Sequence, residues 1–108
     1  MSIWTTQLRK GVIELAVLGA LAGGEAYGYE LLQRLNALDG LSLKESTVYP
    51  LLARLTKEKL LSVRVVPSAS GPPRRYYRLT SPGEARLSAM IQEWEQLQSA
   101  VNHFLKKV

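Results

Sequence analysis

The residues best suited to chemistry in this 108-residue chain are arginines and lysines gathered between positions 44 and 78. That stretch holds eight basic and two acidic residues, whereas the rest of the chain holds six basic and seven acidic ones. The stretch therefore accounts for the whole net charge of +5. A basic segment inside a folded region is typical of a surface that binds a phosphate backbone. The sequence therefore predicts a nucleic acid as the partner.

Residues suited to catalysis or metal binding are scarce. The chain has no cysteine and a single histidine, His103, which excludes disulfides and thiolate ligands and argues against a zinc site. No nucleophile stands beside an acid or a base, and the loop at 67–73 lacks the spacing of a phosphate-binding loop. We therefore expect no enzyme activity, no metal and no cofactor. The lack of cysteine also favours a cytoplasmic protein.

An apolar run from Gly11 to Gly24 comes after Arg9 and Lys10, and this order resembles a short signal peptide. Glu14 interrupts the run, however, and the run is too short to span a membrane. Its apolar residues also recur at helical spacing, as in a helix that packs on a domain core. We therefore expect a core helix and no membrane partner.

The elements that must position the basic side chains begin with three short helices. Hydrophobic periodicity predicts them at about 6–22, 26–38 and 45–59, and a glycine-containing turn ends each of the first two. The third helix has one apolar face with residues at relative positions 0, 3, 4 and 7, which are Val48, Leu51, Leu52 and Leu55. Three such helices with tight connections indicate a helix-turn-helix.

A basic β-hairpin is expected next. Two β-prone runs, at 61–66 and 74–79, flank the Gly/Pro/Ser-rich loop at 67–73. Alternation places Arg74, Tyr76 and Arg78 on one face and Arg75, Tyr77 and Leu79 on the other. A helix-turn-helix followed by such a hairpin is a winged helix, so the fold is expected to be mainly α, in the α+β class, with a wing at about 62–79.

A long C-terminal helix completes the expected fold. Ser81 is its expected N-cap, with Thr80 as the competing cap, Pro82 at the first helical position and Glu84 two residues later. An apolar residue then recurs every three or four positions, at Leu87, Met90, Trp94, Leu97, Val101, Phe104 and Val108. A domain of this size cannot cover so long a stripe, and a second copy is its simplest partner. We therefore expect a DNA-binding domain at 1–80 and a dimerisation helix at 81–108.

Four sequence fragments, in their order and spacing, resemble the PadR-like transcriptional regulators. They are GVIEL at 11–15, AYGYEL at 26–31, STVYPLL at 46–52 and RRYYRLT at 74–80. The resemblance implies a homodimeric winged-helix binder of double-stranded DNA, usually a repressor, with some members responding to small molecules. Two positions depart from the family pattern: Lys44 replaces a capping Ser or Thr, and Lys59 replaces a helix-ending glycine.

The outward face of the third helix and the wing supply the candidate DNA contacts. Hydroxyls can bond phosphates or base edges, and arginines can pair with guanine or phosphate. The candidates are Lys44, Ser46, Thr47, Tyr49, Pro50, Arg54, Lys57, Arg64, Arg74 and Arg75. The alternative is an ordinary solvated helix face, with Arg64 and Arg78 only shielding the edge of the sheet. Of the two wing tyrosines, Tyr76 and Tyr77, we expect at least one to pack on the core.

The apolar stripe of the last helix supplies the candidate dimer interface. Trp94 would sit near its symmetry mate, and a gap between two indoles suits a planar aromatic effector. The alternative is that Trp94 fills the interface with Leu97 and either Trp4 or Leu8. The candidate interface residues are Leu8, Leu87, Met90, Trp94, Leu97, Val101 and Phe104.

The sequence thus favours a homodimeric transcriptional regulator that binds an inverted repeat, and the family resemblance implies a repressor. Release by an aromatic effector and simple filling of the interface by Trp94 both stay open. Each third helix would enter one major groove, with the half-sites about one DNA turn apart. The alternative is a winged-helix protein–protein module whose apolar last helix binds a different partner.

Overall fold

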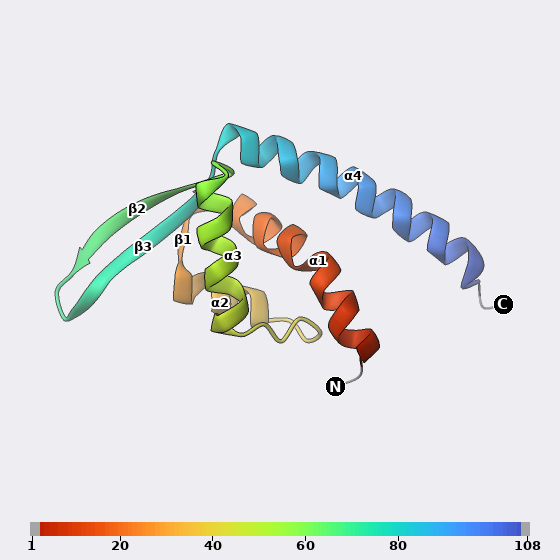
Figure 1. Cartoon of the computed structure of the whole chain (residues 1–108), viewed down its shortest axis with the longest axis horizontal. Helices are drawn as coiled ribbons and strands as arrows, with labels where there is room; N and C mark the ends of the chain where they lie inside the picture. Colours follow the sequence, from red (N-terminus) through yellow and green to blue (C-terminus); the bar gives the residue numbers. More distant parts are fainter. Residues whose placement is uncertain (1–2, 107–108) are drawn as a thin grey trace.

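The computed structural model describes residues 3–106, which form four helices and a three-stranded antiparallel sheet (Figure 1). In chain order the elements are α1 (Ile3–Ala22), β1 (Ala26–Tyr27), α2 (Gly28–Asn36), α3 (Glu45–Lys57), β2 (Leu61–Ser68), β3 (Gly71–Leu79) and α4 (Ser81–Phe104). The helices α1, α2 and α3 gather into a head, the β2–β3 hairpin projects from one side of it, and α4 runs out from the other side (Figure 1). Val108, predicted in the apolar stripe, lies outside the described residues.

The core forms where the apolar faces of the three head helices meet the base of the sheet. Its fully buried side chains include Leu18 of α1, Leu31 of α2 and Leu61 of β2. The apolar face predicted for the third helix is confirmed, because Val48, Leu52 and Leu55 have no exposed surface and Leu51 packs against them. This burial fixes which face of α3 remains outside.

The first two helices differ from prediction at their ends. The first begins at Ile3 rather than near residue 6. The second spans Gly28–Asn36 rather than 26–38, because Ala26 and Tyr27 form the short strand β1 beside β3. The Glu30 carboxylate accepts the Tyr27 N–H at 3.3 Å, which helps to start α2 directly after that strand.

The end of α3 is closed by a residue in a left-handed conformation. Lys59 has a φ of 65°, and the N–H of Leu60 donates to the carbonyl of Leu55 at 2.9 Å. The Lys59 N–H donates to the carbonyl of Thr56 at 3.0 Å, which completes a Schellman motif without glycine. The helix therefore ends at Lys57, two residues earlier than predicted.

The wing is longer than predicted, and its loop is shorter. The strands continue to the pair Ser68–Gly71, so only residues 69 and 70 turn, whereas a loop over 67–73 was expected. The three prolines at 67, 72 and 73 suggested a loop because each lacks a backbone donor. They are tolerated because the register is irregular between Val66 and Ser68, where the ladder needs fewer donors.

The start of α4 locks this helix to the head. Thr80, not Ser81, is the N-cap: its Oγ1 accepts the Gly83 N–H at 3.1 Å. The same hydroxyl donates to the Lys59 carbonyl at 2.7 Å. Ser81 lacks this partner, and the difference favours Thr80 as the cap. Gly83 lies directly against the carbonyl of Leu60, and a Cβ atom at this position would collide with it.

Candidate nucleic-acid interface

The outer face of α3 presents the polar residues that the sequence predicted. Ser46, Tyr49, Pro50 and Lys57 are exposed, on the side opposite the buried apolar face. Pro50 lies inside the helix and removes the backbone donor that would otherwise bond to the Ser46 carbonyl. The first half of α3 therefore offers small hydroxyls and one aromatic ring to whatever lies against it.

The register of the hairpin decides which wing residues turn toward α3. Arg75 pairs with Val65, and Tyr77 pairs with Val63 on the same face of the sheet. Tyr77 is partly buried against the core, so the expectation that at least one wing tyrosine packs there is confirmed. Arg75 thus lies on the face of the sheet that meets α3. The side chain of Arg74 leaves the strand on the opposite face, as the predicted alternation requires.

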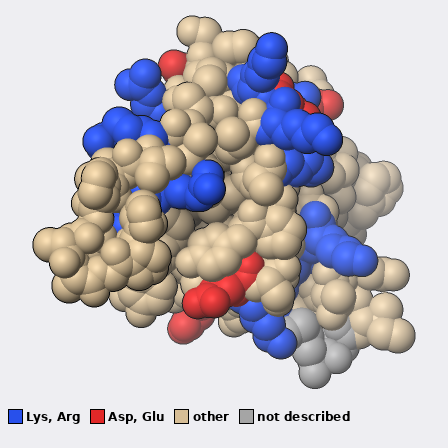
Figure 2. All heavy atoms as spheres, turned by 60° about the vertical axis from the view of Figure 1, so that its left-hand side comes forward, with Lys and Arg blue, Asp and Glu red and all other residues tan. Residues whose placement is uncertain are grey.

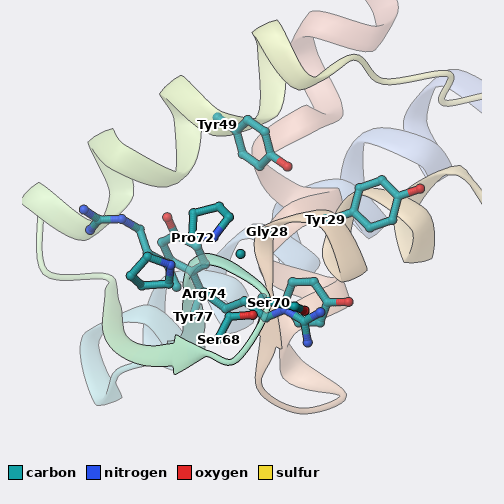
Figure 3. Close-up of a pocket in the computed structure, with 12 residues that line it drawn as sticks. Gly28, Tyr29, Tyr49, Ser68, Ser70, Pro72, Arg74 and Tyr77 are labelled. Carbon is teal, nitrogen blue, oxygen red and sulfur yellow. The ribbon is translucent and has the colours of Figure 1, made fainter.

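A groove of about 620 Å³ separates the wing from the start of α2 and the first half of α3. Figure 3 shows the Tyr49 ring on the α3 side of the groove, with Gly28 between it and Ser68 and Ser70 of the wing. The approach is close, because a Cβ atom at Gly28 would lie 2.7 Å from Cε1 of Tyr49. The groove is therefore walled by two helices and the hairpin, with Arg74 and Arg75 along its wing side.

Two tyrosine hydroxyls in this region stay protonated. Partial burial raises the pKa of Tyr49, and the Glu45 carboxylate raises it further. Burial also raises the pKa of Tyr77. Both phenols are therefore hydrogen-bond donors at neutral pH, as a phosphate oxygen requires.

Lys57 and Arg75 come together at the other end of α3. They line one hollow with Ala53, Thr56 and Tyr77, so cations from a helix and from a strand face the same space. Figure 2 views the wing side of the molecule and shows many more Lys and Arg side chains than Asp and Glu side chains. This hollow and the groove beside Tyr49 form a continuous flank along α3, which we call the wing-side flank (both include Arg75 and Tyr77).

Arg64 lies on the outer face of the wing, away from the wing-side flank. Its Nη2 atom is 2.6 Å from Oε1 of Glu25, and its guanidinium lies over the Tyr76 ring at 4.9 Å. The hydrogen bond from Arg64 lowers the pKa of Glu25 below its ordinary value. Arg74 also contacts this outer face, with its guanidinium 4.5 Å from the centre of the Tyr27 ring. The structure therefore does not bring Arg64 together with Lys57 and Arg75.

Arg54 turns toward the other helices of the head. Its Nη2 donates to Oε1 of Glu14 at 2.7 Å, and its Nη1 lies 3.0 Å from Oε2 of Glu58. Both hydrogen bonds raise the pKa of Arg54, and the bond to Glu14 has the larger effect. The second oxygen of Glu14 accepts from Arg86 of α4 at 3.0 Å. Arg54, a predicted DNA contact, is thus held in an ion-pair network, although about half of its side chain is exposed.

Lys44 and Thr47 lie on the opposite flank of α3 from Tyr49. Lys44 is the N-cap residue and its side chain makes no capping hydrogen bond, which agrees with its departure from the family pattern. Together with Arg9 and Lys10 of α1 it lines a further hollow. Sequence reasoning missed Arg9 and Lys10, because no local pattern shows that α1 passes beside the start of α3. It also missed Tyr27 and Gly28, which only the pairing of β1 brings to the groove.

The apolar stripe of α4 divides into two parts. Leu87 is buried in the core of its own chain, and Met90 packs against that core, because the first turns of α4 are fixed to the head. Trp94 is half-buried. Beyond it, the stripe is uncovered within the chain at Leu97, Val101 and Phe104, and Trp4 and Leu8 of α1 are exposed as well.

The described part of the chain lacks features of two other kinds. Residues 3–106 contain no cluster of three or more His, Asp or Glu side chains that could hold a metal ion. Within the same range, no helix has the length and apolar character needed to cross a membrane.

Comparison with known proteins gives one consistent family. The model of the transcriptional regulator PadR-like family matches residues 17–89. A PadR-like regulator from Bacillus cereus is 37% identical, with 94% of this chain and 99% of that chain covered and a TM-score of 0.82. A PadR-like transcription factor from Bacteroides fragilis is 39% identical, covering 95% and 99% of the two chains, with a TM-score of 0.78.

A third solved structure was determined with a nucleic acid. Bacillus subtilis PadR, in complex with operator DNA, is 30% identical and has a TM-score of 0.69, with 74% of this chain and 45% of that chain covered. The predicted winged helix with a hairpin wing is thereby confirmed. The matched segment also contains three of the four fragments on which the resemblance rested. This chain belongs to the PadR-like family of transcriptional regulators.

Proposed function

We propose that the chain acts as a homodimeric repressor that binds double-stranded DNA through α3 and the wing. The observation that carries this proposal is the wing-side flank, where Lys57 of α3 and Arg75 of β3 line one hollow. Cations from two elements can then follow one phosphate strand while α3 lies in the adjacent major groove. The complex of Bacillus subtilis PadR with operator DNA supports duplex DNA as the partner.

Within this proposal the candidate residues divide by position. Ser46, Tyr49 and Pro50 lie on the exposed face at the start of α3, which enters the groove first in helix-turn-helix proteins. Arg54 would have to exchange Glu14 for a base or a phosphate. The remaining contacts would be to the phosphate backbone of the DNA, from Lys44, Thr47, Lys57, Arg74 and Arg75, with Arg64 on the outer face of the wing contributing least.

A second copy would cover the apolar surface of α1 and α4. Leu97 and Phe104 are 59% and 85% exposed in the single chain, and Trp4 is 68% exposed. Burying such surface is worth about 25 cal/mol per Å² before association costs. We therefore assign residues 1–80 to DNA binding and 81–108 to dimerisation. Two heads joined in this way suit an inverted repeat with half-sites about 34–36 Å apart.

Trp94 is the proposed place for a planar aromatic effector. It lies between the part of α4 that packs on the head and the part that is uncovered. Two copies of the residue near a dimer axis could hold a flat ring between them. A ligand there would change the angle between the arms and so the distance between the two α3 helices. In the alternative, the two indoles simply fill the interface.

A binding titration tests the proposal. Duplexes would be selected from a random pool with the wild-type protein, and the affinity for the selected duplex would be measured at several salt concentrations. We expect log K to fall linearly with log salt, with a slope of about 0.9 for each phosphate contacted. Failure to select any duplex at low salt would contradict DNA binding. For the effector, quenching of Trp94 by planar aromatics would be followed in a Trp4→Phe variant.

The competing function is a winged-helix protein–protein module. The uncovered apolar half of α4 favours it, because a different partner helix could occupy that surface. Such a module would be monomeric until its partner is added, whereas the proposed regulator has twice the chain mass of 12.0 kDa on its own.

A further inference from the structure

A second group of cations lies on the side of α3 opposite the wing-side flank. Arg9 and Lys10 of α1 and Lys44 line a hollow of about 290 Å³ that also includes Thr47. Thr47 and Tyr49 are two residues apart, which separates them by about 200° around a helix. Tyr49 faces the wing-side flank and Thr47 faces this hollow. We call the hollow the α1-side site.

The cations around the α1-side site suit an anion, whereas Ile13 and Leu43 form an apolar part of its lining. Among the described residues that line it, none is Asp or Glu, whereas three are cations and Thr6, Ser42 and Thr47 carry hydroxyls. Lys10 and Lys44 are exposed, so their ammonium groups can reach a ligand outside the protein. Since Lys10 belongs to α1 and Lys44 to the loop before α3, the site exists only because these two segments are held together.

Several hydrogen bonds hold the loop beside α1. The side chain of Asn36 donates to the Leu43 carbonyl and accepts the Leu43 N–H, both at 2.8 Å. Arg9 Nε donates to the carbonyl of Gly40 at 3.0 Å, which ties α1 to the same loop. Leu43 itself is buried in the core. The position of Lys44 relative to Lys10 is therefore fixed before any ligand arrives.

We propose that the α1-side site binds a phosphate of the DNA strand that lies across the major groove from the wing. This inference rests on the proposed function. A helix in the major groove, which is about 12 Å wide, has one phosphate strand on each side. Lys57 and Arg75 face the strand on the wing side. Lys10 and Lys44 face the other strand, so α3 is clamped from both sides and cannot roll in the groove.

Two charge-removing variants test the site. Lys10→Gln and Lys44→Gln each remove one exposed cation from it. Lys106→Gln is the matched control, since it removes the same charge beyond the last residue of α4, outside the apolar stripe proposed for the dimer. For each lost phosphate contact, we expect the slope of log K against log salt to fall by about 0.9, equally for the selected duplex and an unrelated one. At 0.1 M salt this corresponds to an affinity loss of about eightfold. The Lys106 variant should keep the wild-type slope.

A second measurement locates the contact on the DNA. Selected duplexes carrying a single neutral methylphosphonate would be scanned with the wild type and with the double variant K10Q/K44Q. Neutralising one phosphate, across the groove from the wing contact, should weaken binding by the wild type. Neutralising the same phosphate should not weaken binding by the double variant any further. The site would be overturned if the double substitution and each methylphosphonate weakened binding additively at every phosphate. Salt slopes of the lysine variants equal to that of Lys106→Gln would overturn it as well.

The two experiments separate this inference from the function on which it rests. If wild type selects no duplex, the proposed function fails. If wild type binds and both lysine variants bind equally well, DNA binding stands and only the α1-side site is wrong. A weaker dimer in Lys10→Gln, with unchanged DNA affinity for each dimer, would also overturn the site and reassign the lysine to the contact between chains.

Discussion

Arg54 of α3 and Glu14 of α1 form an ion pair in which Nη2 and Oε1 are 2.7 Å apart. The other carboxylate oxygen of Glu14 pairs with Arg86 of α4 at 3.0 Å. One carboxylate therefore joins the helix proposed to read DNA with the helix proposed to form the dimer. Exposed ion pairs contribute at most about 1 kcal/mol to stability, so Arg54 can leave this pair for DNA at modest cost.

Arg54→Ala should weaken binding to the selected duplex by about 5- to 150-fold, because a lost arginine–base contact costs about 1–3 kcal/mol. Arg86→Ala is the matched control, since it breaks the same Glu14 network from the side of α4. We expect the control to bind within twofold of wild type in a fluorescence anisotropy titration. Equal losses in both variants would mean that Arg54 acts only through the network.

Arg75→Ala should weaken binding to all duplexes alike and lower the salt slope by about 0.9 for each phosphate lost. Arg64→Ala removes the same charge from the outer face of the wing, where the side chain is paired with Glu25. Its effect on the slope should be smaller, and the two slopes can be compared in parallel titrations. A larger effect for Arg64 would place the DNA against the outer face of the wing instead.

Lys59→Gly should stabilise the fold by about 0.5–1 kcal/mol, because a side chain at a φ of 65° is strained where glycine is not. Lys57→Gly, two residues earlier, should instead destabilise by a similar amount, since Lys57 is still helical. Urea unfolding followed by circular dichroism measures both. Destabilisation by Lys59→Gly would show that the left-handed end of α3 is not formed.

Gly83→Ala should destabilise by about 3 kcal/mol or more, because the added methyl would collide with the Leu60 carbonyl and push α4 from the head. Gly19→Ala is the control, since no atom of the described residues crowds a Cβ atom built on that glycine. There the gain in helix propensity should stabilise by up to about 1 kcal/mol. Thermal unfolding of the two variants should shift in opposite directions, and a neutral Gly83→Ala would contradict the docking of α4.

Local patterns were enough to predict most of the fold. The 3.6-residue period of Val48, Leu52 and Leu55 identified the buried face of α3, and strand alternation separated Arg74 from Arg75. The predicted bounds of the wing loop were wrong because proline and glycine indicate turns only on average. Here an irregularity in the strand register accommodated them. The predicted N-cap was wrong because the hydroxyl of Thr80 donates to the carbonyl of Lys59, a residue distant in the sequence.

The candidate site was less predictable, because its contacts join segments far apart in the chain. The partner of Arg54 is 40 residues away, and that of Arg64 is 39 residues away. The charge at residues 44–78 therefore indicated a candidate region but not which of its side chains are already paired. Arg9 and Lys10 fell outside that region entirely, and only the packing of α1 beside the loop before α3 places them near Lys44.

Two chains joined through α4 should present two cationic faces to one duplex, and every proposed DNA contact depends on this arrangement. Sedimentation velocity of the protein, alone and with the selected duplex at low salt, counts the chains in each particle. We expect a particle of twice 12.0 kDa without DNA at micromolar concentration, and two chains on each duplex when DNA is added. A single chain in both samples, or a protein that does not sediment with the duplex, would contradict the proposed dimer on DNA.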